Sequence, residues 1–209
     1  MMSNLRGSVK TILSVILLWL GSSSMAYEWT QLELGTGRNQ YWQYVSASSD
    51  GTVILGRFGS NYTYYEDKRY PSFISRDSGS TWTLVPMPSG MTYPTWMNMT
   101  QDGGTIFVHS ISVNNHLMYK STDDGALWTS FNILGGESFA PTTFTMNSDA
   151  SVIVCVGGTQ SVNGFVSISV NSGASFSAYR IETSPTLKFT PGAISVNEAG
   201  TKLICRGTS

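Results

Sequence analysis

Residues 121–128 read STDDGALW, and this stretch decides the fold. A close copy, SRDSGSTW, occupies residues 75–82, and a degenerate copy, SVNSGASF, occupies residues 169–176. The shared pattern is Ser-x-Asp/Asn-x-Gly-x-x-aromatic, and its Asp or Asn recurs after 46 and then 48 residues. A period of this length is typical of solenoids and propellers, in which each repeat is one supersecondary unit. The sequence therefore predicts a repeat architecture.

A second turn motif keeps the same period as the first. It is marked by four equivalent residues, each followed by a polar turn and a strand, at intervals of 52, 47 and 50 residues: Ser48, Thr100, Asn147 and Asn197. Two motifs in one period divide each repeat into four short strands, which form an antiparallel meander. Such sheets arranged around an axis make a β-propeller, so we expect an all-β fold built of four-stranded antiparallel blades.

We expect the repeats to fill residues 27–209 as one propeller domain. Three full blades are predicted at about residues 41–88, 93–136 and 140–182, a partial blade at 189–209, and an orphan or closing outer strand at 27–34. Three full blades with partial ones make a small, incomplete ring whose strand edges stay open. The prediction is therefore a fragment of a larger propeller, with self-association of two half-propellers as the alternative.

Residues 1–26 have the pattern of a secretory signal. A positively charged start precedes the apolar run TILSVILLWL at residues 11–20, and SMA at residues 24–26 supplies a cleavage site. We expect a mature chain that begins at Tyr27 and is secreted, or else periplasmic or in an organelle lumen. No stable membrane insertion is expected after cleavage, and an uncleaved membrane anchor is the alternative.

The composition limits the classes of partner. Only 12% of the residues are charged and the formal net charge is -1, so the chain has no basic field for nucleic acid. Its two cysteines, Cys155 and Cys205, lie at equivalent repeat positions, each eight residues past the second turn motif. Equivalent positions on neighbouring blades are usually too far apart for a disulfide. We therefore expect two small buried apolar side chains, with a disulfide as the alternative.

The first motif resembles the Asp-box, or bacterial neuraminidase repeat, of the β-propellers in sialidases, sortilin-type receptors, some glucan hydrolases and photosystem II assembly factors. The resemblance covers nearly all of residues 27–206. In that family the motif turns between the third and fourth strands of a blade: Asp accepts backbone hydrogen bonds, Gly adopts positive φ, and the aromatic ring packs between blades. It implies structural roles for Asp77, Gly79, Trp82, Asp123, Gly125, Trp128, Asn171, Gly173 and Phe176. Because the third copy departs from the pattern, we expect its turn to be looser.

Strand order predicts which end of the propeller binds ligands. In a meander, the turns after the first and third strands share one end, and the other loops share the opposite end, where propellers usually bind around the central channel. The candidate binding residues at that end are Tyr62, Tyr64, Tyr65, Glu66, Arg69, Tyr70, His109 and His116. Aromatic rings beside polar groups suit sugar binding, and a loop packed on its neighbour has the same composition. Both histidines are expected to be exposed in a loop.

No catalytic set is evident in the sequence. The resemblance to sialidases would imply an arginine triad, a Tyr–Glu pair, an acid Asp and an Arg-Ile-Pro motif. The chain has no Arg-Ile-Pro, and its arginines are not expected at equivalent blade positions. Glu66 and Asp67 are adjacent, whereas retaining glycosidases hold two carboxylates about 5 Å apart. Two histidines without a third ligand predict no metal site, and no cofactor motif occurs.

We therefore predict a secreted, non-catalytic β-propeller that acts as a binding or scaffold module for a glycan or a protein, without a cofactor. A sialidase-like glycoside hydrolase, incomplete in this chain, is the first alternative. A photosystem assembly role is a further option that the resemblance allows.

Overall fold

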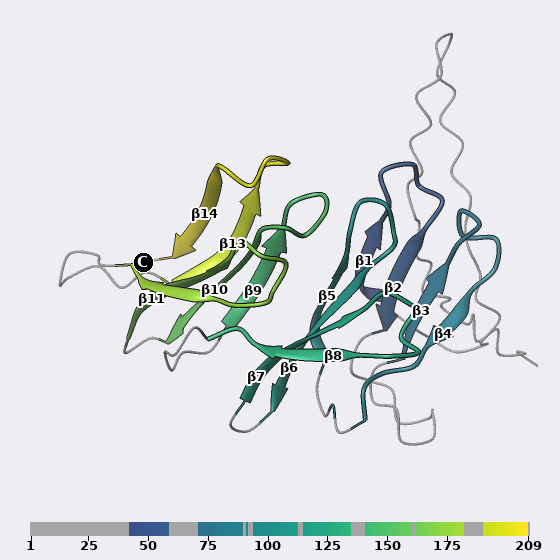
Figure 1. Cartoon of the computed structure of the whole chain (residues 1–209), viewed down its shortest axis with the longest axis horizontal. Coiled ribbons are helices and arrows are strands. Elements are labelled where there is room, and N and C mark those ends of the chain that lie inside the picture. The colour runs from purple at the N-terminus through teal and green to yellow at the C-terminus, as the bar shows by residue number, and fades with distance from the viewer. Residues whose placement is uncertain are drawn as a thin grey trace, which may run out of the picture.

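The computed structural model describes residues 42–58, 71–89, 91, 94–112, 115–134, 141–159, 162–181 and 190–208. Within these ranges all regular secondary structure is β, with fourteen strands and no helix (Figure 1). Accordingly, these ranges hold no helix long and apolar enough to cross a membrane. The predicted signal at 1–26 and the predicted outer strand at 27–34 lie outside the described residues.

The strands form four antiparallel sheets, and each sheet is ordered as its strands follow one another in the chain. The first sheet contains β1 (Trp42–Ala47), β2 (Ile54–Phe58), β3 (Ser72–Ser75) and β4 (Thr83–Val85). The second contains β5 (Pro94–Met99), β6 (Ile106–Ser112), β7 (Asn115–Ser121) and β8 (Thr129–Asn132). The third contains β9 (Pro141–Met146), β10 (Ile153–Thr159), β11 (Val162–Ser169) and β12 (Ser177–Arg180). The fourth contains β13 (Thr190–Val196) and β14 (Leu203–Thr208).

Each four-stranded sheet is a meander, which confirms the predicted all-β fold. The first strands pack against one another in succession, β1 with β5, β5 with β9, and β9 with β13. Figure 1 shows the sheets following one another across the molecule, from β1–β4 in blue to β13–β14 in yellow. The molecule is therefore a partial β-propeller in which the first strand of each sheet lies innermost.

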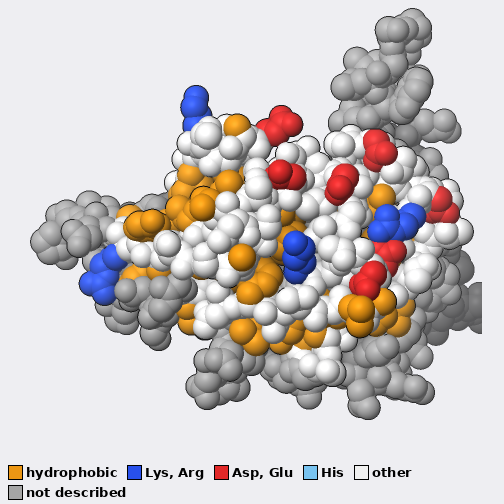
Figure 2. All heavy atoms as spheres, viewed as in Figure 1, with side chains coloured by type: hydrophobic (Ala, Val, Ile, Leu, Met, Phe, Trp, Pro, Cys, Tyr) orange, Lys and Arg blue, Asp and Glu red, His pale blue; other side chains and the backbone are white. Residues whose placement is uncertain are grey.

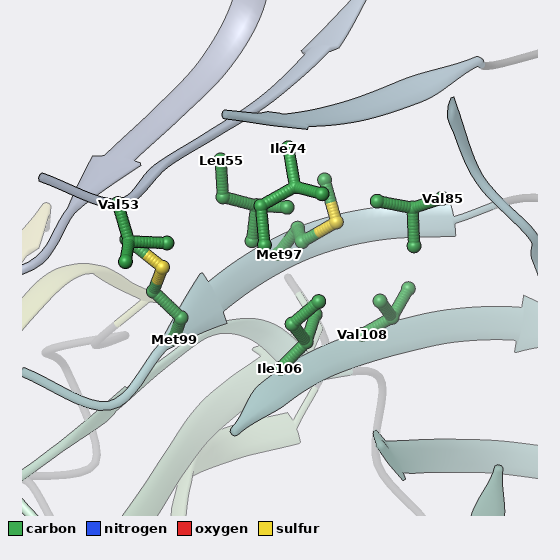
Figure 3. Packing of buried hydrophobic residues seen from close by; sticks show 8 residues of the cluster. All are labelled: Val53, Leu55, Ile74, Val85, Met97, Met99, Ile106 and Val108. Carbon is green, nitrogen blue, oxygen red and sulfur yellow. The ribbon is translucent and has the colours of Figure 1, made fainter. Parts of the chain in front are cut away.

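The hydrophobic core lies between neighbouring sheets. Eight buried side chains fill the space between the first and second sheets and point toward one another in Figure 3: Val53, Leu55, Ile74, Val85, Met97, Met99, Ile106 and Val108. A second cluster fills the space between the second and third sheets: Phe107, Met118, Ile133, Phe144, Ala150, Ile153 and Cys155. Full burial of one such Leu, Ile, Val or Phe side chain contributes about 1.5–3 kcal/mol, so sheet-on-sheet packing holds the fold together.

The second strands of the second and third sheets, β6 and β10, are buried on both faces, because a neighbouring sheet covers each side. In β6, Ile106 and Val108 pack against the first sheet, whereas Phe107 between them packs against the third. A strand in this position needs apolar residues at successive positions, which explains why its sequence lacks polar alternation.

The turns that follow the first and third strands of the sheets lie together at one end of the molecule, which we call the turn end. The Ser78 amide donates to the Thr52 carbonyl at 2.9 Å, which joins the two turns of the first sheet. The Ser49 amide donates to the Gln101 carbonyl at 2.7 Å, and the Gln101 amide to the Ser148 carbonyl at 2.9 Å, which joins successive sheets. The opposite ends of the strands form the loop end. The structure thus has the division into two ends that strand order predicts.

The hairpin of β6 and β7 is longer than the sequence predicts. Backbone pairing continues to Ser112 and Asn115, so the predicted loop from His109 to His116 is wrong and both histidines lie in strands. The side chain of His109 is buried, which also contradicts its expected exposure. The neighbouring sheet covers this part of β6, and a single-sequence pattern does not reveal that cover.

Both cysteines are free thiols, so the structure contains no bond between them. Cys155 is buried in the second core cluster, whereas Cys205 in β14 is partly exposed. Burial raises the pKa of both thiols above the ordinary value. The expectation of a buried apolar side chain therefore holds fully for Cys155 and only in part for Cys205.

Candidate functional site

The three Ser-x-Asp/Asn turns at the turn end share one hydrogen-bond pattern. In the first, Ser75 Oγ donates to Asp77 Oδ1 at 2.8 Å and accepts from the Gly79 amide at 2.8 Å. Asp77 Oδ1 also accepts from the Thr81 amide at 2.8 Å, and Asp77 Oδ2 accepts from Thr81 Oγ1 at 2.6 Å. The carboxylate is therefore used to close its own turn.

The other two copies reproduce this geometry. Asp123 accepts from Ser121 Oγ and from the Leu127 amide, at 2.8 and 2.9 Å. In the third copy, Asn171 Oδ1 accepts from Ser169 Oγ and the Ser175 amide, both at 2.9 Å. The glycine of each copy has φ between 88° and 89°. The third turn is thus as tightly bonded as the others, because an Asn side-chain oxygen accepts the same hydrogen bonds as a carboxylate oxygen.

The aromatic residues of the second and third turns pack against the preceding sheet, and the aromatic residue of the first turn packs within its own turn. Trp128 Nε1 donates to the Pro86 carbonyl of the first sheet at 2.8 Å. Phe176 stacks on Phe131 of the second sheet, with ring centroids 5.8 Å apart. Trp82 Nε1 donates to the Gly79 carbonyl of its own turn at 3.0 Å. Trp128 and Phe176 therefore fasten one sheet to the next, whereas Trp82 packs within the first sheet; all three roles are structural.

The turn end carries the negative charge of the described chain. Every acidic residue that the structure describes lies in one of these turns: Asp50, Asp77, Asp102, Asp123, Asp124, Asp149 and Glu198. Figure 2 shows acidic side chains (red) over the upper and right-hand parts of the described surface. Hydrogen bonds from Thr81 and Ser75 lower the pKa of Asp77 to about 2, and similar bonds lower the pKa of Asp123. Hydrogen bonds within their own turns therefore favour the ionised form of Asp77 and Asp123, so both are poorly suited to proton transfer.

One exposed ion pair crosses between sheets at this end. Arg76 of the first sheet pairs with Asp124 of the second, through its Nε at 2.8 Å and through Nη2. The Asp124 carboxylate raises the pKa of Arg76. An exposed pair of this kind contributes little stability, so its main effect is to align the two turns.

The loop end contains a feature that is not evident from the sequence. In each of the four sheets the first strand has a β-bulge five residues before the marker residue of the second turn motif. The bulged residues are Gln43, Thr95, Thr142 and Gly192. A bulge adds one residue to a strand and re-aims its side chains, and bulges are frequent next to functional sites. The bulges therefore mark the inner strands at the loop end as the candidate functional site.

A buried arginine joins the bulges of the first and second sheets. The Arg57 guanidinium donates to the carbonyls of Pro94 and Thr95, the latter at 3.2 Å, and to Gln43 Oε1 at 2.7 Å. It also lies over the ring of Tyr44, with 4.6 Å between the guanidinium carbon and the ring centroid. The guanidinium thus fixes the relative position of β1 and β5 at the loop end.

Aromatic and polar side chains surround this arginine. The rings of Tyr44 and Trp96 meet edge to face, with centroids 5.1 Å apart, and both are partly exposed. Burial raises the pKa of Tyr44, and the charge of Arg57 opposes that rise. Thr95 Oγ1 and His109 Nδ1 form a hydrogen bond of 2.7 Å. We call this set the junction cluster, and its members are Gln43, Tyr44, Arg57, Thr95, Trp96 and His109.

The structure separates the residues predicted as binding candidates. Tyr62, Tyr64, Tyr65, Glu66, Arg69 and Tyr70 lie outside the described residues. His109 belongs to the junction cluster as a buried member, and the His116 backbone pairs with Ile111 in the hairpin. In the described part of the chain, no three His, Cys, Asp or Glu residues are grouped so as to hold a metal ion.

Sequence reasoning missed most of the junction cluster. Tyr44 and Trp96 stand four residues before the second turn motif, and Arg57 and His109 stand nine residues after it. Arg206 stands at this position in the fourth sheet, so the prediction that the arginines share no blade position is wrong for Arg57 and Arg206. An alignment of the repeats on the second turn motif would have revealed both sets of equivalent residues.

Comparisons with known proteins identify the fold. No family model matches the chain, and no curated protein matches it. Among solved structures, it is similar to a chain in a nidogen/laminin complex, with a TM-score of 0.55 and 12% identity over 87% of this chain and 60% of that one. It is similar to YCF48 bound to D1 peptide, with a TM-score of 0.52 and 14% identity over 79% of this chain and 46% of that one. It is similar to a GH74 enzyme of Niastella koreensis, with a TM-score of 0.53 and 16% identity over 79% of this chain and 26% of that one.

These structures are β-propellers, and the likeness shows that fold for the present chain. Identities of 12–16% carry no information on activity or ligand. The chain spans less than two thirds of the length of each of the three.

Proposed function

We propose that this chain forms part of a non-catalytic β-propeller that binds a protein or peptide at its loop end. The observation that carries the proposal is the junction cluster, in which a buried cation, two aromatic rings and a hydroxyl are held around bulged inner strands. Partly exposed Tyr44 and Trp96 supply amphipathic contact area, and the exposed side chain of Gln43 supplies hydrogen bonds. Aromatic residues of this kind dominate the binding energy of protein interfaces.

Two of the similar structures are described with a protein or peptide partner, the nidogen/laminin complex and YCF48 bound to D1 peptide. Those partners belong to those proteins, and they show only that the shared fold is used for this kind of binding. A glycan is the other ligand class that rings beside hydrogen-bonding groups would suit.

A glycoside hydrolase is the second candidate function, favoured by the likeness to a GH74 enzyme. A retaining hydrolase needs two carboxylates about 5 Å apart at the binding end. All acidic residues of the described chain lie in turns at the other end, so the required carboxylates would have to come from outside the described residues. Binding without catalysis is therefore the function we put first.

We further propose that the repeats are Asp-box repeats and that the chain is exported through cleavage after Ala26. The common hydrogen-bond pattern of the three turns supports the first point, and the pattern of residues 1–26 motivates the second. N-terminal sequencing of protein from a secreting host should give Tyr27 as the first residue. A retained start at Met1 would contradict export by cleavage.

The binding proposal is tested with a peptide library. A phage-displayed library of random dodecapeptides is panned on the immobilised chain, and the enriched peptide is titrated calorimetrically into the native chain and two variants, Tyr44→Ala and Gln43→Ala. We expect Tyr44→Ala to weaken binding at least about 10-fold, because central aromatic contacts are typically worth more than 1 kcal/mol. Gln43→Ala should weaken binding less.

The matched control is Leu127→Ala, which removes an exposed side chain at the turn end. It should leave the affinity unchanged. A peptide that loses equal affinity with Leu127→Ala, or a library without enrichment, would contradict the proposal. A glycan array and a polysaccharide hydrolysis assay on the same preparation would then identify the glycan or the hydrolase alternative.

A further inference from the structure

His109 is a buried histidine within the junction cluster. Its side chain is 1% exposed, and its Nδ1 lies 2.7 Å from Thr95 Oγ1. The same hydroxyl can donate to the His109 carbonyl oxygen, 3.2 Å away. A hydroxyl has one proton to donate, so a neutral imidazole can accept that proton at Nδ1, whereas an imidazolium donates from Nδ1 and leaves the hydroxyl proton to the carbonyl. The Thr95 side chain is therefore compatible with both protonation states of His109.

Thr95 also connects His109 with a buried cation. The Thr95 carbonyl accepts from Arg57 Nη2 at 3.2 Å, while the Thr95 hydroxyl is bonded to His109. The Arg57 side chain is 2% exposed, and a guanidinium keeps its charge at any pH that a folded protein meets. Protonation of His109 would therefore place a second buried cation against the same residue.

The described strands around His109 bring positive charge or none to it. Phe107 and His109 are two residues apart in β6, so their side chains lie on the same face of the sheet, and the Lys120 ammonium of β7 lies 5.9 Å from the centroid of the Phe107 ring. The other ionisable neighbours are Cys155 of β10, which packs against Phe107, and Tyr44 of β1. Burial raises the pKa of both groups, so both are neutral at and below about pH 7.5. The described residues of β5 and β9 include no ionisable side chain.

We propose that His109 is a pH-sensitive switch of the junction cluster, whose neutral form holds the two aromatic rings in place for binding and whose protonation in mild acid loosens them. Burial and neighbouring cations both disfavour the charged form of an imidazole, so its protonation favours any movement of β5 that hydrates it. Trp96 follows Thr95 in β5, and Tyr44 packs on both Trp96 and Arg57, so such a movement reaches both rings. The inference rests on the proposed binding at the loop end and adds its regulation, which is release of the ligand in acid.

The pH range separates His109 from the aspartates of the turns. A histidine whose charged form is disfavoured in the folded chain contributes its full stability above the unfolded-state pKa of about 6.5, and this contribution is lost as the pH falls through the lower folded-state pKa. Hydrogen bonds within the turns hold the pKa of several aspartates below the ordinary value, and these are Asp50, Asp77, Asp102, Asp123 and Asp149. These aspartates stay ionised in the folded chain between about pH 7.5 and 5.

Proton NMR of the imidazole C2–H signals measures the switch on the full chain. The sequence has two histidines, so the variant His116→Gln leaves the signal of His109 alone. We expect His109 to titrate roughly 1–1.5 pH units below the ordinary midpoint of about 6.5. A midpoint at or above about 6.5, or no titration down to about pH 5, would overturn the proposal.

Urea unfolding and peptide titration then follow the consequence in the native chain, in His109→Gln and in the matched control His116→Gln. The probe is a histidine-free peptide enriched from the library on the native chain. Between about pH 7.5 and 5, the urea midpoint and the peptide affinity of the native chain and of the control should fall, and the fall in affinity should approach 10-fold for each pH unit below the His109 midpoint. His109→Gln keeps a neutral side chain that can bond to Thr95, so it should retain both quantities over this range.

The switch and the binding proposal fail separately. A library without an enriched peptide contradicts binding, while the NMR and urea midpoints still test the switch. A native chain whose affinity does not change with pH, or a His109→Gln variant that loses as much affinity as the native chain, would overturn the switch and leave binding intact. If His109→Gln does not fold, the NMR midpoint of His109 in the His116→Gln variant decides.

Discussion

Gly125 occupies a tight contact between the first and second sheets, and its replacement by alanine is a direct test of how the sheets are joined. Its φ is 88°, in the left-handed region, and an added Cβ would lie 2.7 Å from the Pro86 carbonyl oxygen and 2.8 Å from Val85 Cγ1. The left-handed conformation costs a residue with a Cβ roughly 1–2 kcal/mol. Overpacking against a backbone atom typically costs about 1–3 kcal/mol more.

Gly125→Ala should therefore lower the free energy of unfolding by roughly 2–5 kcal/mol. Urea unfolding, followed by tryptophan fluorescence, measures this loss as a midpoint lower by roughly 1–2.5 M, given an m-value of about 2 kcal/mol/M. Trp128 donates to the Pro86 carbonyl at the same junction, so its emission reports the contact itself.

Gly104→Ala is the matched control, because its φ is not left-handed and its Cβ would meet only the Asp102 carboxylate, at 3.3 Å. That side chain can move, so we expect a change within about 1 kcal/mol. A Gly125→Ala variant as stable as the Gly104→Ala variant would refute the reasoning, because the two sheets would then accommodate the added methyl group without loss of stability.

Three further outcomes are expected. Phe107→Ala should cost about 3–5 kcal/mol in urea unfolding, since the ring is buried between the second and third sheets, and a loss below about 1 kcal/mol would contradict that packing. The folded-state pKa of Asp77 is lowered to about 2 by hydrogen bonds from Thr81 and Ser75, so its contribution to stability is complete above the unfolded-state pKa of about 3.9 and is lost as the pH falls toward 2. The urea midpoint of the native chain should fall over this pH range, and that of Asp77→Asn should fall less. Equal slopes of midpoint against pH in the two proteins would contradict the assignment of this pH dependence to Asp77. A thiol reagent should modify Cys205 in the native chain and Cys155 only after denaturation, and modification of both at one rate would show that the third sheet opens freely.

Most of the architecture follows from local chemistry that a single sequence displays. The Ser-x-Asp-x-Gly turns close through hydrogen bonds between residues two to four positions apart, all between Ser75 and Thr81 in the first copy, so their residue types identify them without knowledge of the rest of the chain. Their period then divides the chain into meanders. The continuous apolar runs of the second strands indicate burial on both faces, and the structure has that burial at Leu55 and Phe107.

The candidate site depends on contacts between sheets, which the sequence does not display. A bulge at Gln43 or Thr95 has no residue signature, because the extra residue is defined by the register of the partner strand. The burial of His109 depends on the length of the β6–β7 hairpin and on the sheet beside it. Arg57 could have been placed among equivalent positions by aligning repeats, but its acceptors at Pro94 and Thr95 belong to the next sheet.

The packing of each sheet only on its neighbours along the chain makes this molecule a one-dimensional array. Its unfolding free energy should then be a sum of sheet and junction contributions, with local opening most frequent at an end. In the described chain β13–β14 packs on the third sheet alone, so its amides should exchange with solvent faster than those of β6, which is clamped on both faces. Such an array can gain or lose a whole sheet while every remaining junction keeps its geometry, and a duplicated segment of one period should therefore be tolerated in its interior.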